Sequence, residues 1–201
     1  MELLIGYDFS SLVIDTLCKQ GVMENAAVAC FYFDFATQEE QSPTAVLGSL
    51  LKQVVGGLNK VPQKIVKAFQ EQLKVVGGLR LALAEIVEFL QDISSTQRTF
   101  ICIDALDECP ARERVKVLDS LSQILLKSSG SRIFLTGRQH IRSEVEKHLA
   151  TMAASRSITP TQDDIGVFIR AKLKEDTIPD AMSESLEEEI IKIIPETVSE
   201  M

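Results

Sequence analysis

No long apolar run occurs in this sequence of 201 residues, and its acidic residues outnumber its basic ones. Because a membrane-spanning helix needs about 18 or more consecutive apolar residues, the sequence predicts no such span. Its first residues, Met-Glu-Leu-Leu-Ile-Gly, lack the basic start and apolar stretch of a signal peptide. The net charge of −8 disfavours nonspecific binding to nucleic acids or anionic membranes. We therefore expect a cytoplasmic protein without a nucleic-acid partner.

The sequence also lacks the cysteine and histidine spacings of metal sites. No Cys-x-x-Cys pair occurs, and His140 and His148 are eight residues apart, about two helical turns, too far to share one ion. Three cysteines lie within apolar patterns, which predicts small buried thiols in a reducing compartment. These three are Cys18, Cys30 and Cys102. The fourth, Cys109, lies near the acidic cluster described next but has no partner that would make it a nucleophile.

Three carboxylates follow directly after one apolar run. The run from Phe100 to Ile103 predicts a strand buried on both faces. Asp104, Asp107 and Glu108 come just past the end of this run. Clustered carboxylates are costly in a desolvated place because like charges repel. A divalent cation and the phosphates it carries would offset that cost. The pattern therefore predicts the metal-holding half of a nucleoside-triphosphate site, with Asp104 on the Mg²⁺ side.

Several blocks of this sequence resemble a known family. Asp-Ala-Leu-Asp-Glu-Cys, residues 104–109, resembles the Walker B motif of NACHT domains, the nucleotide-binding switch modules of the STAND class of P-loop NTPases. Residues 131–138, Ser-Arg-Ile-Phe-Leu-Thr-Gly-Arg, resemble the family's sensor strand. Residues 30–35, with Ser-Pro-Thr at 42–44, look like its second strand and the helix that follows. The resemblance is strongest to fungal NLR-like proteins and their nephrocystin-type relatives, which often carry ankyrin or WD-type repeats downstream.

This resemblance implies a ligand and a role for each matching residue. ATP or GTP would bind together with Mg²⁺, and Asp104 would orient the metal ion. Asp107 or Glu108 would polarise the attacking water. Arg138 would sense the terminal phosphate.

The same residues also allow plainer interpretations. The acids of 104–108 would then simply open a loop and cap the next helix, for which Pro110 would suit the first position. Arg138 would be a surface arginine paired with Glu144 or Glu146. We favour the nucleotide-site interpretation because both blocks follow predicted strands, and parallel sheets place their sites beyond the carboxyl ends of the strands.

The family's phosphate-binding loop, Gly-x-x-x-x-Gly-Lys-Ser/Thr, is missing. The resemblance places this loop between a first strand, of which Leu3–Ile5 looks like a remnant, and the helix that holds Ser10 to Leu17. Ile5-Gly6-Tyr7 stands where Gly-Lys-Thr is expected, and no lysine precedes Lys19. Because the loop amides and the lysine grip the phosphates, we expect impaired nucleotide binding and no activity of this chain alone.

Strand-like and helix-like patterns alternate along the chain, which predicts an α/β fold of P-loop NTPase type with a parallel sheet flanked by helices. The predicted strands are Ala27–Phe35, Thr99–Asp104 and Arg132–Thr136, with a weaker one at Arg156–Ile158. The predicted helices are Thr44–Val55, Gln63–Val75, Leu81–Ile93, Glu113–Lys127, Asp163–Lys174 and Leu186–Ile194. We expect residues 1–158 to form a NACHT-type core, incomplete at its N-terminus, and 159–201 to begin a helical extension that is cut off at Met201.

Two functions of different classes follow from these observations. The first is a nucleotide-dependent switch in an NLR-like signalling protein, impaired here by the missing loop. The second is a noncatalytic interaction module that keeps only the NACHT fold. Other protein domains or self-association are the expected partners besides the nucleotide. Self-association is expected because an incomplete first strand would leave the sheet near Phe100–Ile103 without a neighbour.

Overall fold

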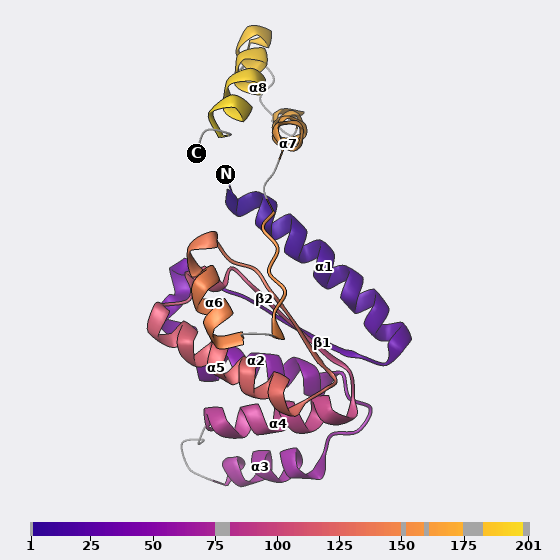
Figure 1. The fold of residues 1–201 in the computed structure, drawn as a ribbon. Coiled ribbons are helices and arrows are strands. Elements are labelled where there is room, and N and C mark those ends of the chain that lie inside the picture. Colours follow the sequence, from indigo (N-terminus) through magenta and orange to yellow (C-terminus); the bar gives the residue numbers. More distant parts are fainter. Residues whose placement is uncertain (1, 75–80, 150–151, 159–160, 175–182, 199–201) are drawn as a thin grey trace. The chain divides into compact units, whose positions relative to one another are not determined.

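A computed structural model of the chain describes residues 2–74, 81–149, 152–158, 161–174 and 183–198. The chain divides into two compact units, residues 1–154 and residues 155–201. The first unit holds the sheet and most of the helices, and the second holds two helices (Figure 1).

The first unit is built on three parallel strands. They are β1 (Ala27–Tyr32), β2 (Thr99–Asp104) and β3 (Ser131–Leu135), in the order β1-β2-β3. Cys30, Cys102 and Phe134 lie side by side across the three strands, which fixes the register. The α/β fold predicted from the sequence, a parallel sheet flanked by helices, is confirmed.

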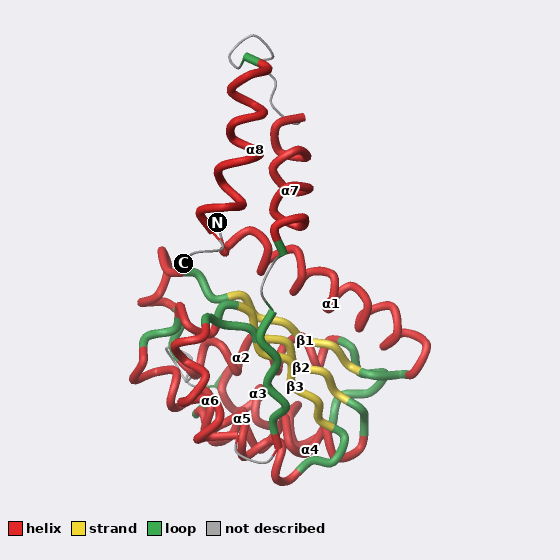
Figure 2. Tube along the Cα trace, turned by 45° about the horizontal axis from the view of Figure 1, so that its top comes forward, coloured by secondary structure: helices red, strands yellow, loops and turns green. Residues whose placement is uncertain are grey.

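Helices cover both faces of this sheet (Figure 2). One face packs on α2 (Pro43–Gly56) and α5 (Ala111–Lys127), α4 (Leu83–Thr96) packs on both of these helices, and α3 (Gln63–Leu73) lies outside α4. Each of the first three helices has an apolar stripe at helical spacing, so their inner side chains and one set of strand residues form a single core. Its most completely buried members include Ala29, Phe33, Leu47, Leu50, Leu90, Ile101 and Leu118.

The opposite face of the sheet is covered by α1 (Glu2–Glu24), which contacts β1 and β2. This is the face on which Asp104 lies, because residues alternate between faces along a strand and Asp104 is two residues beyond Cys102. A short helix, α6 (Arg142–Leu149), follows β3 and packs on α5. Three-residue to six-residue 3₁₀ turns complete the unit at Phe35–Glu40, Leu106–Glu108 and Gln139–Ile141.

The helix predictions hold to within a few residues, except at the start of the chain. The Ser42 side chain accepts a hydrogen bond from the Ala45 N–H at 3.3 Å and so caps the start of α2. The end at Val75 of the predicted helix Gln63–Val75 lies outside the described residues. Leu3–Ile5, predicted as a strand remnant, is instead part of α1. A short apolar run of this kind cannot be assigned to strand or helix by periodicity alone.

Two further strand predictions are wrong. The first strand ends at Tyr32, and Phe35 begins a 3₁₀ turn in which the Asp34 side chain accepts a hydrogen bond from the Ala36 N–H. Residues Arg156–Ile158 form no strand and are irregular. The expectation that β2 would lack a neighbour is also wrong, since β2 is the central strand and pairs on both sides.

The second unit consists of α7 (Gln162–Lys174) and α8 (Glu184–Val198), which pack on each other. Ile165 and Ile169 are buried, whereas Val167 on the other side of α7 is 65% exposed. The predicted helices Asp163–Lys174 and Leu186–Ile194 both lie within these two elements. Among the described residues, no helix is long and apolar enough to cross a membrane.

The four cysteines are free thiols in unequal surroundings. Cys102 and Cys109 are buried, and desolvation raises the pKa of Cys102 to about 12 and that of Cys109 to about 11. Cys30 is half-buried, and Cys18 is exposed on α1. The prediction of a buried Cys18 is therefore wrong. α1 carries apolar residues of its own on several sides, and only one of these sides packs on the sheet.

Alkylation at pH 8 should distinguish these thiols. Since the thiolate is the nucleophile, a thiol with a pKa of about 12 is ionised in about one molecule in ten thousand at this pH. We expect iodoacetamide to modify Cys18 first and to leave Cys102 and Cys109 unmodified in the folded chain, as read by mass spectrometry of peptides. All four thiols should react in denaturant. Rapid modification of Cys102 without denaturant would contradict the packing of β2.

Candidate functional site

Side chains from three elements meet at the carboxyl end of the central strand. Asp104, the last residue of β2, is 4% exposed. The hydroxyl groups of Ser10 on α1 and of Thr136, just after β3, both donate hydrogen bonds to its Oδ1 atom. A buried carboxylate is stable only when such donors or a cation compensate its lost hydration.

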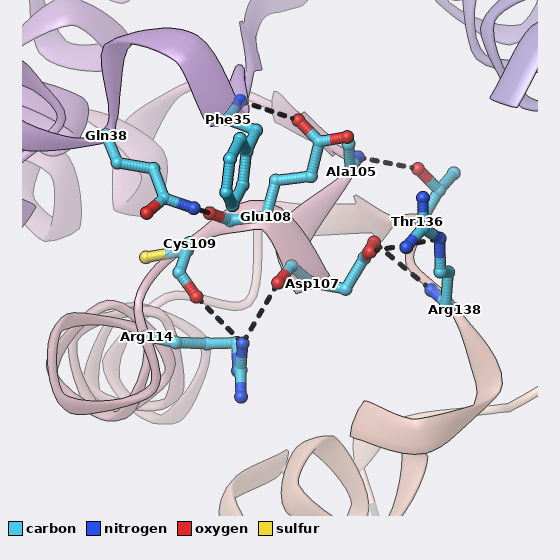
Figure 3. Close-up of polar contacts among 9 residues, drawn as sticks. All are labelled: Phe35, Gln38, Ala105, Asp107, Glu108, Cys109, Arg114, Thr136 and Arg138. Atoms are coloured by element: carbon cyan, nitrogen blue, oxygen red, sulfur yellow. Dashed lines mark hydrogen bonds and ion pairs between the residues drawn. The ribbon is translucent and has the colours of Figure 1, made fainter.

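Thr136 ties the loop after β2 to the end of β3. Its side-chain oxygen accepts a hydrogen bond from the Ala105 N–H at 3.1 Å (Figure 3). Its carbonyl accepts one from the Leu106 N–H at 3.0 Å. Its own N–H donates to the Ile103 carbonyl at 3.0 Å. Ala105 adopts a left-handed conformation with φ of 52°, which costs an alanine about 1 kcal/mol. The chain therefore turns sharply after Asp104 and places Asp107 beside the end of β3.

Asp107 and Arg138 form the second contact between the two strand ends. The Arg138 Nε atom lies 3.5 Å from Asp107 Oδ2, and the Arg138 N–H donates to Oδ1 at 3.2 Å (Figure 3). The Asp107 side chain is 6% exposed, whereas that of Arg138 is 49% exposed. A Cβ atom on Gly137 would lie 2.7 Å from Ile141 Cδ1, so glycine suits this close turn. The Arg138 side chain thus reaches solvent, while its main-chain N–H is held by Asp107.

The alternative partners considered for Arg138 are occupied by other arginines. Glu144 pairs with Arg114 at 2.8 Å, and Glu146 pairs with Arg142 at 2.7 Å. The capping alternative is wrong as well, since Asp107 and Glu108 lie in a 3₁₀ turn of their own. The following helix α5 begins at Ala111 without a side-chain cap, and Pro110, expected at the first helical position, is the residue just before it.

Glu108 points toward the end of β1 rather than toward Arg138 (Figure 3). Its Oε2 atom accepts a hydrogen bond from the Phe35 N–H at 2.9 Å, and its carbonyl accepts one from the Gln38 side chain at 2.6 Å. Of the two residues predicted to polarise a water molecule, Glu108 is therefore used here to hold the segment after β1, and Asp107 is paired with Arg138.

Arg114 is a residue that the sequence analysis did not single out. This arginine of α5 is 8% exposed, and its Nη1 atom donates to the Cys109 carbonyl at 2.8 Å and to the Asp107 carbonyl at 3.3 Å. Its Nε and Nη2 atoms bind Glu144 Oε2 at 2.9 and 2.8 Å. The guanidinium therefore fixes the turn that carries the acids against α6. An arginine in the first turn of an amphipathic helix, with Arg112 and Lys116 two residues to either side, gave no signal of this role.

Ser10 is the second residue that sequence reasoning missed. In P-loop NTPases, the hydroxyl of the Ser/Thr that ends the Gly-x-x-x-x-Gly-Lys-Ser/Thr loop and a strand-end aspartate hold Mg²⁺ together. The contact of Ser10 with Asp104 resembles that pair of groups. With Ser10 at the end of the loop pattern, the register differs by three residues from the expected one, which ends at Tyr7. Leu3, Asp8 and Phe9 then occupy the positions of the two glycines and the lysine. The paired serines Ser10-Ser11 were the available signal.

The residues fit Mg²⁺ and do not fit its phosphates. A hydroxyl and a carboxylate oxygen are the protein ligands that Mg²⁺ takes in such sites. The positions of the missing loop, however, lie inside α1, which runs unbroken from Glu2 to Glu24. The amides from Gly6 onward are therefore bonded within the helix and cannot cradle an anion. Among the described residues, no three His, Cys, Asp or Glu side chains form a metal cluster by themselves.

The chain matches a known family over most of its first unit. Residues 9–138 match the family model described as nephrocystin 3, N-terminal. The matched segment begins one residue before Ser10 and ends at Arg138, so it contains the whole of the site. No curated protein matches the chain at a significant level.

Proposed function

The chain belongs to the nephrocystin 3 N-terminal family, and from this membership and its site we propose that it is a NACHT-type nucleotide switch module of an NLR-like signalling protein whose own grip on ATP or GTP is impaired. In such a module the bound nucleotide would act with Mg²⁺, which neutralises phosphate charge. The proposal includes a cytoplasmic location and protein rather than nucleic-acid partners.

The observation that carries this proposal is the contact of Ser10 with Asp104 beyond the central strand. Burying a carboxylate between two hydroxyls is unusual for a purely structural strand end, and the same pair of groups holds Mg²⁺ in P-loop NTPases. Asp107 and Arg138 lie next to it, with the arginine half exposed. Arg138 is the group whose charge would respond to a terminal phosphate.

A second candidate function is favoured by the part of the same site where the phosphates of a nucleotide would bind. The unbroken α1 and the use of Glu108 as a main-chain acceptor suit a noncatalytic interaction module that has kept only the fold. The two candidates differ in one measurable property, because only the first predicts that restoring the loop restores Mg²⁺-dependent binding.

The test is the triple variant Leu3→Gly, Asp8→Gly and Phe9→Lys, which writes Gly-x-x-x-x-Gly-Lys-Ser into residues 3–10. We expect it to bind ATP in the presence of Mg²⁺, measured by calorimetry, because it regains the lysine and frees the loop amides from the helix. In this background Asp104→Asn should weaken the Mg²⁺-dependent part, since it removes a charged ligand of a hard cation. Asp119→Asn on α5 removes the same charge elsewhere and should leave binding unchanged.

Arg138→Ala in the same background tests the sensor role. A cation aimed at the terminal phosphate loses its contact when that group leaves, so its contribution is differential. A charge-assisted contact of about 1.5–3 kcal/mol corresponds to roughly a ten- to hundredfold smaller preference for ATP over ADP. Equal loss of both affinities would make the arginine structural. Failure of the triple variant to bind any nucleotide would favour the interaction module instead.

A further inference from the structure

Three of the four cysteines belong to the layer in which α1 packs on the sheet. Cys30 and Cys102 are paired in the register of β1 and β2, so their side chains are neighbours on one face, the face that α1 covers. Cys18 belongs to α1 itself, which contacts both strands. The fourth, Cys109, ends the turn that holds the acids. Three different elements therefore each bring a thiol to this helix–sheet layer.

Two contacts fix how α1 lies on β1 (Figure 2). Near the end of α1, a Cβ atom on Gly21 would lie 3.1 Å from Val28 Cγ2, so the helix comes as close to the strand as a glycine allows. Nearer its start, Ser11 faces Tyr32, since burial raises the pKa of the Tyr32 phenol and a hydrogen bond with the Ser11 side chain partly lowers it. Later residues of α1 thus meet earlier residues of β1, and the two elements run in opposite directions.

Cys18 and Cys30 lie between these two contacts. Cys18 follows Ser11 by seven residues, about two helical turns, and therefore lies on the same side of α1. Cys30 precedes Tyr32 by two residues and shares its face of β1. Burial raises the pKa of the Cys30 thiol, and the charge of Cys18 raises it further. This effect of one thiol on the other agrees with their places on the helix and the strand.

The three thiols differ in their access to solvent. Cys18 is exposed, whereas Cys30 is half-buried and its S–H group donates a weak hydrogen bond to Gln53 Oε1 at 3.7 Å. Cys102 is 1% exposed, and burial, followed by the charges of Cys30 and Cys18, raises its pKa to about 12. Because exposed thiols are oxidised most readily, an oxidant in solution reaches Cys18 first, and Cys30 is the neighbouring thiol that is still partly accessible.

We propose that Cys18 and Cys30 are a redox pair, which a hydroperoxide oxidises to a disulfide that ties α1 to β1. An exposed cysteine beside a partly covered one suits a thiol that is oxidised first and a thiol that resolves it. In a reducing compartment such a bond is transient, which suits a sensor rather than a permanent link. The inference goes beyond nucleotide binding and does not depend on it.

The chemistry needs only the two thiols and the peroxide. The Cys18 thiolate attacks one peroxide oxygen, an S–O bond forms, the O–O bond breaks, and the leaving oxygen takes up a proton. Cys18 is then a sulfenic acid, oxidised by two electrons. The Cys30 thiolate attacks Cys18 Sγ, the S–S bond forms, and hydroxide leaves and is protonated to water. With hydrogen peroxide, two thiols and one peroxide give one disulfide and two waters.

The first experiment identifies the bond in the intact chain. The fully reduced protein is treated with one equivalent of hydrogen peroxide, free thiols are blocked, and trypsin digestion without reductant is followed by mass spectrometry. Trypsin cuts after Lys19 and Lys52, so Cys18 and Cys30 lie in different peptides. We expect residues 1–19 joined to residues 20–52. Because the reaction is within one chain, the yield should not change over a hundredfold dilution.

Three variants assign the two roles. Cys30→Ser should leave Cys18 as a sulfenic acid, which dimedone traps, because no thiol resolves it. Cys18→Ser changes an exposed side chain, so the chain should fold normally and form no disulfide at the same peroxide dose. Cys102→Ala is the matched control, since it removes the other thiol beside Cys30 and should leave the joined peptides unchanged.

The disulfide should also be visible in the stability of the chain. A bond between residues 18 and 30 restricts the unfolded chain, so the midpoint of thermal unfolding should rise by roughly 5–10 °C on oxidation. Circular dichroism measures this midpoint, and dithiothreitol should return it to the value of the reduced chain. Cys18→Ser should show no shift on the same treatment.

Several outcomes would overturn the proposal. One is a disulfide between Cys18 residues of two chains, whose yield would rise with protein concentration. Another is a disulfide between Cys30 and Cys102, and a third is a sulfinic acid on Cys18 beside an unchanged Cys30 thiol. A lower unfolding midpoint in the oxidised chain would mean that the bond pulls α1 from its place on β1, and the pair would not be built into the fold.

Discussion

Replacing Arg114 by methionine is expected to lower the free energy of unfolding by about 3–5 kcal/mol, the largest single-residue effect on stability that we predict. Methionine keeps the length of the stem but removes every donor. Glu144 would then be left as a charge without its partner, and the Cys109 carbonyl would lose its 2.8 Å hydrogen bond. Because the Glu144 side chain is 22% exposed, water relieves part of this cost and the lower end of the range applies. Urea unfolding followed by circular dichroism measures it.

A matched control is available on the neighbouring helix. Arg142 and Glu146 form an ion pair at 2.7 Å with both side chains about half exposed, and Arg142→Met should cost less than about 1 kcal/mol. The double variant Arg114→Met and Glu144→Met should recover much of the loss, because no unpaired charge remains. A loss in Arg114→Met no greater than in Arg142→Met would mean that the turn holding Asp107 does not depend on this arginine.

The second large effect concerns the unmodified chain and nucleotide. Calorimetry with ATP at millimolar concentration and Mg²⁺ is expected to show no binding or only weak binding. Loss of the lysine and of loop amides removes three or more charge-assisted contacts, about 4–5 kcal/mol in all, which is more than a thousandfold in affinity. The remaining carboxylates repel the phosphates unless a metal ion lies between them.

A titration with Mg²⁺ alone is the control, because the oxygen atoms of Ser10 and Asp104 could bind the metal ion without any nucleotide. Micromolar affinity for ATP that disappears with EDTA would show that other residues replace the loop, and the statement that binding is impaired would be wrong. The same titration with GTP addresses the choice of base, for which the described site offers no argument.

Strand interiors and amphipathic helices were predictable because their signals are local. Phe100 to Ile103 is a continuous apolar run, and α4 and α5 repeat apolar residues at helical spacing, so each element is decided within its own segment. The acids after β2 and the arginine after β3 were predictable as a shared site, since the ends of parallel strands lie at one edge.

The predictions that failed concern short segments and the partners of individual side chains. Leu3–Ile5 is part of α1 because the residues after it continue the helix, and three apolar residues look alike in a strand and in a helix. Arg156–Ile158, in which only Ile158 favours strands, is irregular. The two partners considered for Arg138, Glu144 and Glu146, follow it closely in the chain. Its actual partner, Asp107, lies 31 residues before it.

By itself, the sequence determined that this chain forms an α/β fold with a parallel sheet, that carboxylates cluster after its central strand, and that no phosphate loop follows its start. Only the tertiary structure decided that Ser10 meets Asp104, that Arg114 holds the acidic turn, and that Gln53 bonds the main chain of Cys30 on the outer strand β1. The physical reason is range. Helix and strand patterns arise from neighbours in sequence, whereas each of these contacts joins residues on different elements and follows from how those elements pack.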